Sequence, residues 1–241
     1  MSNPLEQFKI KTLIPLELAG FDISFTNSSL FMMLAVLFVC LLFVLALRKP
    51  AVIPSRIQST GEVLFEFISN LLKEFVGSEG RRYFPLIFTT FMFVLLCNLL
   101  GMLPYSFTVT SHIVVTFALG MSIFLIVNII AFARNGFAFF GFFLPSGVPL
   151  IMAPMMIFIE VFTYLARPFS LSVRLAANMM AGHVLLKVLA GFVVMMGLVS
   201  GWVPIPIISL MIGFEVFVAV LQAYIFTILI CVYLSDAVNM H

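Results

Sequence analysis

Charged residues are scarce in this sequence. Asp, Glu, Lys and Arg make up 9% of its 241 residues, whereas 63% are hydrophobic and the mean hydropathy is +1.24. A soluble globular domain carries roughly 25% charged residues, so the composition excludes that class and is typical of a polytopic membrane protein. The net charge of +2 comes without a basic run, which argues against a nucleic-acid partner. The lipid bilayer is therefore the first partner that the sequence predicts.

Residues that form disulfides or bind metals are also few. Cys40, Cys97 and Cys231 lie in three separate apolar segments, where we expect them to act as small hydrophobic side chains. Their spacing, and that of the 3 histidines, fits neither a disulfide framework nor a metal site. We therefore expect no metal and no cofactor. The N-terminus lacks an apolar stretch followed by a small-residue cleavage site, so no removable signal or transit peptide is predicted.

Long apolar runs are abundant. They predict five membrane-spanning helices, at residues 30–47, 84–103, 113–133, 154–197 and 203–235. We expect an all-α polytopic protein that forms one transmembrane domain over residues 1–241, with residues 1–29 as an N-terminal segment. Half of the 12 Lys and Arg residues lie between the first two spans: Arg48, Lys49, Arg56, Lys73, Arg81 and Arg82. By the positive-inside rule, this connection is cytoplasmic or matrix-side, which puts the N-terminus outside and the C-terminus inside.

A further helix, too polar to be a span, is predicted at residues 59–76. The segment Ser59-Thr60-Gly61-Glu62 has the pattern of a capping box, so we expect the helix to begin there. A polar stripe at helical spacing lies opposite an apolar face, and its members are Glu62, Glu66, Asn70 and Lys73. The pattern favours an amphipathic helix in the plane of the membrane interface, and a loop helix that packs on a partner protein is the alternative.

The last two apolar runs are too long for straight spans. At 1.5 Å per residue, residues 154–197 and 203–235 would form helices about 66 and 50 Å long, against a hydrocarbon core of about 30 Å. We expect a long, steeply tilted antiparallel hairpin with its turn at Ser200-Gly201. A bend is expected near Pro168, because its ring removes a helix hydrogen bond. The preceding residues 137–149 are predicted to form a loop, because Gly and Pro interrupt them.

Arg174 lies in the middle of the fifth run. An arginine at the centre of a membrane helix costs about 2.5 to 17 kcal/mol, and it cannot lose its proton because its pKa stays above about 12. One interpretation is an arginine near a helix end that extends toward the interface. The interpretation that we prefer is a fixed positive charge on an ion path. Ala177 and Ala181 on the same face would let a partner helix approach, and we expect that partner to supply the missing anion, with core packing of the two alanines as the alternative.

Polar residues of the last two helices fall opposite one another when the pair is folded at its turn. The predicted pairs are Arg174 with Gln222, His183 with Glu215, and Glu160 with Asp236. At 100° per residue, one face of the fifth helix carries Glu160, Arg167, Ser170, Arg174, Asn178 and Ala181. His183 falls on the opposite side of that helix. We therefore predict two offset half-paths, an outer one past His183 and Glu215 and an inner one past Glu160, with Arg174 between them.

His183 and Glu215 are predicted to form a proton relay, because both groups can titrate near physiological pH in a partly buried site. A structural hydrogen-bonded pair is the alternative. Asn98 and Asn128 are expected to form hydrogen bonds between helices. Arg167 is expected to line the inner path or to extend to the interface. The two remaining histidines, His112 and His241, are expected at the surface.

The residues around Arg174 and Gln222 resemble those of a known family, subunit a of the rotary F-type ATP synthase. The resemblance is carried by LSVRLAANMMAGH at 171–183 and LQAYIF at 221–226, with support from NLLGMLP at 98–104 and FDISFTN at 21–27. It implies a stator arginine at Arg174, with Asn178 and Gln222 beside it. It also implies that His183 and Glu215 line an outer half-channel and that Glu160 lies on an inner one.

The same resemblance implies the partners. They are a ring of c subunits with mid-membrane carboxylates that face Arg174, the b-type subunits of the peripheral stalk, and other ATP synthase subunits. The implied ion is the proton, and the implied membrane is the mitochondrial inner membrane or the bacterial plasma membrane. The predicted function is thus a proton-translocating stator subunit that is not an enzyme by itself. A stand-alone secondary transporter or proton channel is the alternative, and a purely structural assembly anchor is a third interpretation.

Overall fold

The computed structural model describes residues 9–15, 17–18, 21–22, 24–48, 51, 53–103, 106–136, 139, 141, 152–200, 202 and 204–238. Its α-helices are α1 (Asn27–Leu47), α2 (Arg56–Phe75), α3 (Phe84–Gly101), α4 (Ile113–Asn135), α5 (Ala153–Ser200) and α6 (Pro204–Val238). The 3-10 helices η2 (Ser78–Tyr83) and η3 (Val109–Ser111) precede α3 and α4. Two short antiparallel ribbons precede α1: β1 (Thr12–Ile14) with β4 (Phe25–Thr26), and β2 (Glu17–Leu18) with β3 (Phe21–Asp22). Most of the predicted loop at 137–149, Gly201 of the predicted turn, and His241 lie outside the described residues.

Five of the helices are long and apolar enough to cross a membrane: α1, α3 together with η2, α4, α5 and α6. The prediction of an all-α fold with five helices able to span a membrane is therefore confirmed for the described residues. The helix ends agree with the predicted ones to within three residues. The ribbons before α1 were not predicted, because strands of two or three residues leave too little alternation to recognise in a sequence.

The start of α2 differs from the prediction by one helical turn. Its N-cap is Ser55, whose side-chain oxygen accepts a hydrogen bond from the Gln58 backbone N–H. The expected cap at Ser59 is therefore wrong. Both serines are followed three residues later by Gln or Glu, and the earlier one is used because Gln58 also bonds the preceding chain. Its side-chain amide donates to the Ala51 carbonyl at 3.1 Å and accepts from the Ala51 N–H at 3.3 Å.

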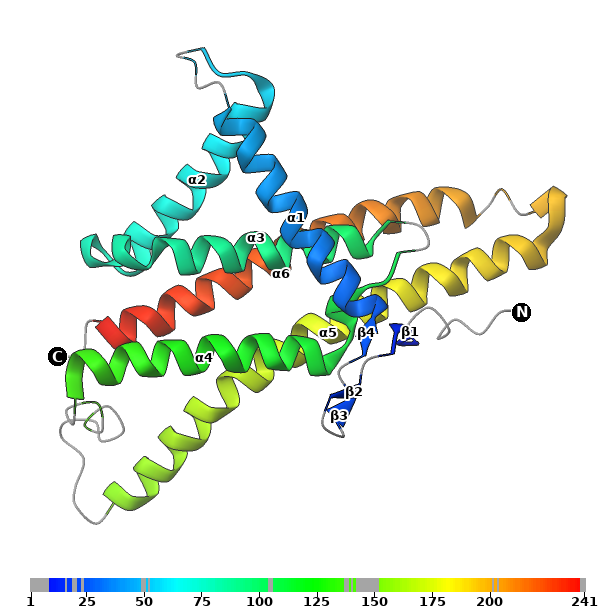
Figure 1. Ribbon diagram of the computed structural model, residues 1–241. Helices are drawn as coiled ribbons and strands as arrows, with labels where there is room; N and C mark the ends of the chain where they lie inside the picture. The colour runs from blue at the N-terminus through cyan, green and yellow to red at the C-terminus, as the bar shows by residue number, and fades with distance from the viewer. Residues whose placement is uncertain are drawn as a thin grey trace.

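Helix α6 lies at the centre of the bundle, where it contacts α2, α3, α4 and α5. Figure 1 shows α3 and α4 running beside α6, and the second half of α5 running beside the first half of α6, while α1 and α2 form an inclined hairpin at one side. One side of α6 is buried along much of its length, through residues that recur at helical spacing: Ala219, Ala223, Phe226, Ile230 and Leu234. The residues on its other side in the first half of the helix are largely exposed.

Helix α5 changes its surroundings at Pro168. None of its residues from 153 to 167 is buried, whereas Leu171, Ser172 and Leu175 are, and in Figure 1 the first half of α5 diverges from α4 and α6. The Ser172 hydroxyl lies 2.7 Å from the Pro168 carbonyl and 3.0 Å from the Thr116 carbonyl of α4. It fits there because Gly120 of α4 has no side chain: a Cβ at that position would come within 2.6 Å of the hydroxyl oxygen. The close approach of α4 thus fixes α5 just after its proline.

Candidate functional site

Arg174 lies on an exposed face of α5 within this chain. Asn178, Ala177 and Ala181, one to two turns further along the helix, are exposed on the same face. Within the described residues Arg174 forms no ion pair; the ion pairs there are Arg134–Glu79, Arg167–Asp236 and His183–Glu215. The guanidinium is therefore left without an anion from the described part of its own chain, as the sequence predicts.

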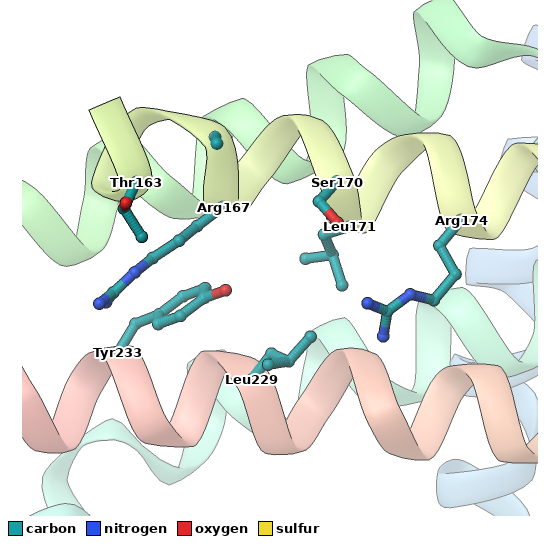
Figure 2. A pocket seen from close by; sticks show the side chains of 8 residues that line it. Thr163, Arg167, Ser170, Leu171, Arg174, Leu229 and Tyr233 are labelled. Carbon is teal, nitrogen blue, oxygen red and sulfur yellow. The ribbon is translucent and has the colours of Figure 1, made fainter. Parts of the chain in front are cut away.

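A cavity of about 210 Å³ lies on one side of Arg174, between α5 and α6. It is lined by Thr163, Ala166, Arg167, Ser170, Leu171, Arg174, Leu229 and Tyr233. Figure 2 shows the side chains of Arg167 and Arg174 both directed from α5 toward α6, with Leu171 and Leu229 between them. Two permanent cations therefore border the same small space.

Arg167 closes the far end of this cavity through three contacts. Its guanidinium pairs with the Asp236 carboxylate at 3.2 Å. The same group lies over the rings of Tyr164 and Tyr233, 5.2 and 5.1 Å from their centroids, which is within the range of cation–π attraction. Unlike Arg174, Arg167 is thus neutralised within the chain.

A second cavity, of about 410 Å³, lies on the other side of Arg174. Its polar lining residues are Arg174, Asn178, Glu215 and Gln222, and most of the others are apolar residues of α5 and α6. The Asn178 side-chain amide donates to the Gln222 side-chain oxygen at 3.1 Å. The Gln222 amide nitrogen is buried and has no hydrogen-bond partner among the described residues. Arg174 is therefore the residue that the two cavities share.

His183 and Glu215 lie together, as predicted. The Nδ1 atom of His183 is 3.6 Å from Oε1 of Glu215. Glu215 is only 5% exposed, and neither of its carboxyl oxygens has a hydrogen-bond partner in the described part of the chain. Its carboxyl group lies directly against Gly182, where a Cβ would come within 2.7 Å of Oε1. Glu215 lines the second cavity, whereas His183 is not among its lining residues.

The predicted pairing of Glu160 with Asp236 is wrong. Asp236 pairs with Arg167, two turns nearer to the centre of α5. Glu160 lies in the diverging first half of that helix, half-exposed. Tyr164 and Arg167 still contact α4 and α6, so the part of α5 that diverges lies before them, and Glu160 falls outside the register on which the prediction depended. The predicted pair of Arg174 and Gln222 lines one cavity, but the hydrogen bond of Gln222 is made with Asn178.

Asn98 and Asn128 both form the expected hydrogen bonds between helices. The Asn98 amide, fully buried in α3, donates to the Ala219 carbonyl of α6 at 3.1 Å. The Asn128 side-chain oxygen of α4 accepts from the Tyr164 hydroxyl of α5 at 2.7 Å. His112 is not the surface group that we expected, since it is half-buried and its ring stacks on Phe107 at 4.9 Å.

Two residues at the site were not singled out in the sequence. Thr108, just before η3, lies 3.0 Å from the Nε2 atom of His183 through its hydroxyl. Thr108 and His183 are 75 residues apart in the sequence, so no local pattern predicted this contact. Gly182 is the other, and the sequence could have predicted its role. It is next to His183, on the turn of α5 that the predicted pairing places opposite Glu215, and a glycine there makes room for a large side chain. Cys97 and Cys231 are buried, and no group of three metal-binding side chains occurs among the described residues.

The comparisons with known proteins agree with the resemblance. The family model described as ATP synthase A chain matches residues 29–235. The protein named ATP synthase subunit a from Rhodospirillum rubrum is 56% identical over 241 residues, which is the full length of both chains. This full-length match includes α5, α6 and every residue of the site. A family match over most of the chain and an identity of this size show that this multi-pass membrane protein belongs to the ATP synthase A chain family, as a subunit that is not an enzyme by itself.

Proposed function

We propose that α5 and α6 form the stator side of a proton path, which loads and unloads carboxylates on a ring of c subunits of the ATP synthase. The single observation that carries the proposal is the position of Arg174. It lies at the junction of two cavities, on an exposed face, without an anion from the described part of its own chain. A permanent cation in such a position needs a partner with negative charge.

The electrostatic role of Arg174 follows from Coulomb's law. At a separation of 4 Å and an effective dielectric constant of about 20, a carboxylate and a guanidinium attract by about 4 kcal/mol. A ring carboxyl group that arrives beside Arg174 is therefore favoured in its ionised form and releases its proton. A bare proton that attempts to pass from one cavity to the other meets repulsion of the same size. Arg174 thus both unloads the ring and separates the half-channels.

The two cavities correspond to the two half-channels. We assign the outer one to His183, Glu215, Asn178 and Gln222, because these groups lie at or behind the cavity on the η3 side of Arg174. We assign the inner one to the cavity that ends at the Arg167–Asp236 pair. Glu160 lies two turns beyond Arg167, about 10 Å further toward the inside. Protons that leave the ring would pass Ser170 and reach Glu160 at the inner surface.

The c-ring docks, in this proposal, on the face of α5 that carries Ala177 and Ala181. Small side chains let a neighbouring helix approach closely enough for its carboxylate to meet Arg174. With 48 and 35 residues, α5 and α6 would be about 72 and 52 Å long, so both helices tilt steeply across a core of about 30 Å.

The orientation rests on the basic residues. Arg134, at the end of α4, pairs with Glu79 of η2, and this end of the bundle also carries Arg81 and Arg82. By the positive-inside rule it is the inner end, so that the N-terminus lies outside and the C-terminus inside. The relative from Rhodospirillum rubrum favours the inner membrane of a bacterium over that of a mitochondrion.

Helix α2 is proposed to lie in the interface plane at the inner surface. Ile68, Leu71 and Leu72 are buried against the bundle, while Glu62 and Glu66 are exposed. This division suits a helix with one face on protein and another near the lipid headgroups. Subunits of the peripheral stalk are the proposed partners for the rest of its surface.

The test is the replacement Arg174→Ala in the complete ATP synthase, reconstituted in liposomes. We expect the complex to assemble and proton-driven ATP synthesis to be lost. Arg134→Ala is the matched control, because it removes an arginine of the same chain whose side chain pairs with Glu79 at the inner surface, and it should leave synthesis near normal. Undiminished synthesis by the Arg174→Ala complex would refute the proposal. The purified chain alone should carry neither protons nor a substrate; steady transport by it would favour the stand-alone transporter.

A further inference from the structure

We propose that Thr108 fixes the tautomer of His183, so that the imidazole exchanges protons with Glu215 only through Nδ1. The inference rests on the proposed function, because it concerns the outer half of the proton path. It makes Thr108 a positioning residue. His183 exchanges a proton with Glu215 but does not pass it further along the path. In this order of proton carriers, a proton enters and leaves the His183 ring through Nδ1. In the usual relay, it would enter at one ring nitrogen and leave at the other.

The hydroxyl of Thr108 has two partners. Thr108 is 3% exposed, and its Oγ1 atom lies 3.2 Å from the carbonyl oxygen of Gly101 and 3.0 Å from Nε2 of His183. A hydroxyl group has one proton to donate, so it can donate to only one of these two groups and must accept from the other.

The Gly101 carbonyl determines which of the two groups receives the Thr108 proton. Gly101 ends α3, where a helix leaves its last carbonyl groups without intrahelical donors, and a carbonyl can only accept. Its other donor among the described residues, the Ser106 hydroxyl, lies closer to the Leu103 carbonyl, at 2.7 Å against 2.9 Å. The Thr108 proton therefore goes to Gly101. Nε2 of His183 must then bring its own proton and donate it to the Thr108 oxygen.

The tautomer determines what Glu215 faces. A neutral imidazole with its proton on Nε2 has a lone pair on Nδ1, and Nδ1 is the atom that lies 3.6 Å from the Glu215 carboxyl group. When the carboxylic acid of Glu215 gives its proton to that lone pair, a carboxylate and an imidazolium form. The Nε2–H bond to Thr108 is unchanged by this step.

The Thr108 hydroxyl does not relay a proton away from the Nε2 atom of His183. Passing a proton from Nε2 onward would require the Thr108 hydroxyl to give its own proton to the Gly101 carbonyl, which cannot take it up or pass it on. The proton on His183 therefore returns through Nδ1. Glu215 is then the carrier that meets the second cavity, and His183 stabilises its ionised form between transfers.

The backbone holds Thr108 in this position. A Cβ on Gly101 would come within 2.7 Å of the Thr108 side-chain methyl and within 3.2 Å of its Cα, so the two residues touch only because position 101 is glycine. The hydroxyl position is thus set by backbone contact between the end of α3 and the segment before η3. The Thr108 hydroxyl therefore holds the His183 ring in one orientation.

The experiment is solid-state NMR of the complete complex in liposomes, with histidine labelled with nitrogen-15, at an alkaline pH where the imidazole is neutral. The His183→Gln complex identifies the signals of His183. We expect the Nε2 atom to carry the proton and Nδ1 to be unprotonated. A spectrum in which Nδ1 carries the proton would overturn the proposal, and this outcome requires no variant of Thr108.

Two variants of Thr108 test the effect of its hydroxyl on the tautomer and on ATP synthesis. Thr108→Val removes the hydroxyl at almost constant volume, and we expect the preference for the Nε2–H tautomer to fall by about two- to tenfold, the equivalent of one neutral hydrogen bond. Proton-driven ATP synthesis should slow by a similar factor, and Thr108→Ser should restore both readouts. Thr90→Val is the matched control, because the one hydrogen bond of its buried hydroxyl among the described residues is to the Leu86 carbonyl of its own helix. An unchanged tautomer in Thr108→Val would overturn the proposal while leaving proton transport by Arg174 and the ring untouched.

Discussion

Replacing Gly182 by Ala tests whether the position of the Glu215 carboxyl group limits proton flow. The new Cβ would lie 2.7 Å from Oε1, 3.1 Å from Cδ and 3.3 Å from Cγ of Glu215, whereas ordinary contact begins at 3.4 Å. The carboxyl group must therefore move by about 0.7 Å, because attractive contact turns to repulsion at shorter range. A misplacement of about 1 Å in a reacting group can lower a rate about a hundredfold, so we expect proton flow to fall about ten- to a hundredfold.

The assay is ATP-driven proton pumping and proton-driven ATP synthesis by the complete complex in liposomes. Gly191→Ala is the matched control, because it adds the same methyl group to the same helix and would meet nothing within 4 Å. Both replacements favour the helix by about 1 kcal/mol, so a loss of helix stability cannot explain a difference between them. Combining Gly182→Ala with Glu215→Asp shortens the crowded side chain and should restore part of the rate. Equal rates for the Gly182→Ala and Gly191→Ala complexes would refute the reasoning.

Three further predictions concern stability. Asp236→Asn removes the anion that pairs with Arg167, and we expect the complex to lose up to about 1 kcal/mol, since the pair is partly exposed; thermal unfolding that is unchanged would mean that the tyrosine rings hold Arg167 alone. Ser172→Ala removes the hydroxyl that joins α5 to α4 and should cost about 0.6 kcal/mol in the same assay; no change in unfolding would mean that this hydrogen bond does not hold the two helices together. Burial lowers the pKa of His112, so its protonation opposes folding, and wild-type stability should fall as the pH drops below about 6.5. His112→Phe retains the stack on Phe107 and should weaken that pH dependence; an identical pH profile would exclude this role.

The sequence was sufficient for features that depend on local pattern. Five apolar runs became five membrane-spanning helices, because no other backbone structure with this composition satisfies its polar groups in lipid. The pair of His183 and Glu215 was also predictable, since both residues lie within about five turns of the hairpin end, where an antiparallel register has little room for error.

The same extrapolation failed further from the turn. Glu160 is 40 residues from Ser200 along α5, and Pro168 lies between them, so the divergence of the helix removes any register that could be counted from the hairpin. Asp236 pairs with Arg167 as a result. Other features had no local signal at all. Ser55 and Ser59 match the same capping pattern, and the contact of Thr108 with His183 joins segments that only the folded bundle brings together.

The central claim is that Arg174 is a charge barrier between two cavities, and passive proton leak tests it most directly. The measurement uses complexes whose ring carboxylates have been replaced by amides, so that rotation carries no protons, in liposomes with an imposed membrane potential. With Arg174 present we expect no measurable leak. With Arg174→Ala, loss of about 4 kcal/mol of repulsion should raise the leak by up to about a thousandfold. A leak that stays at the background level in the Arg174→Ala complex would contradict the account.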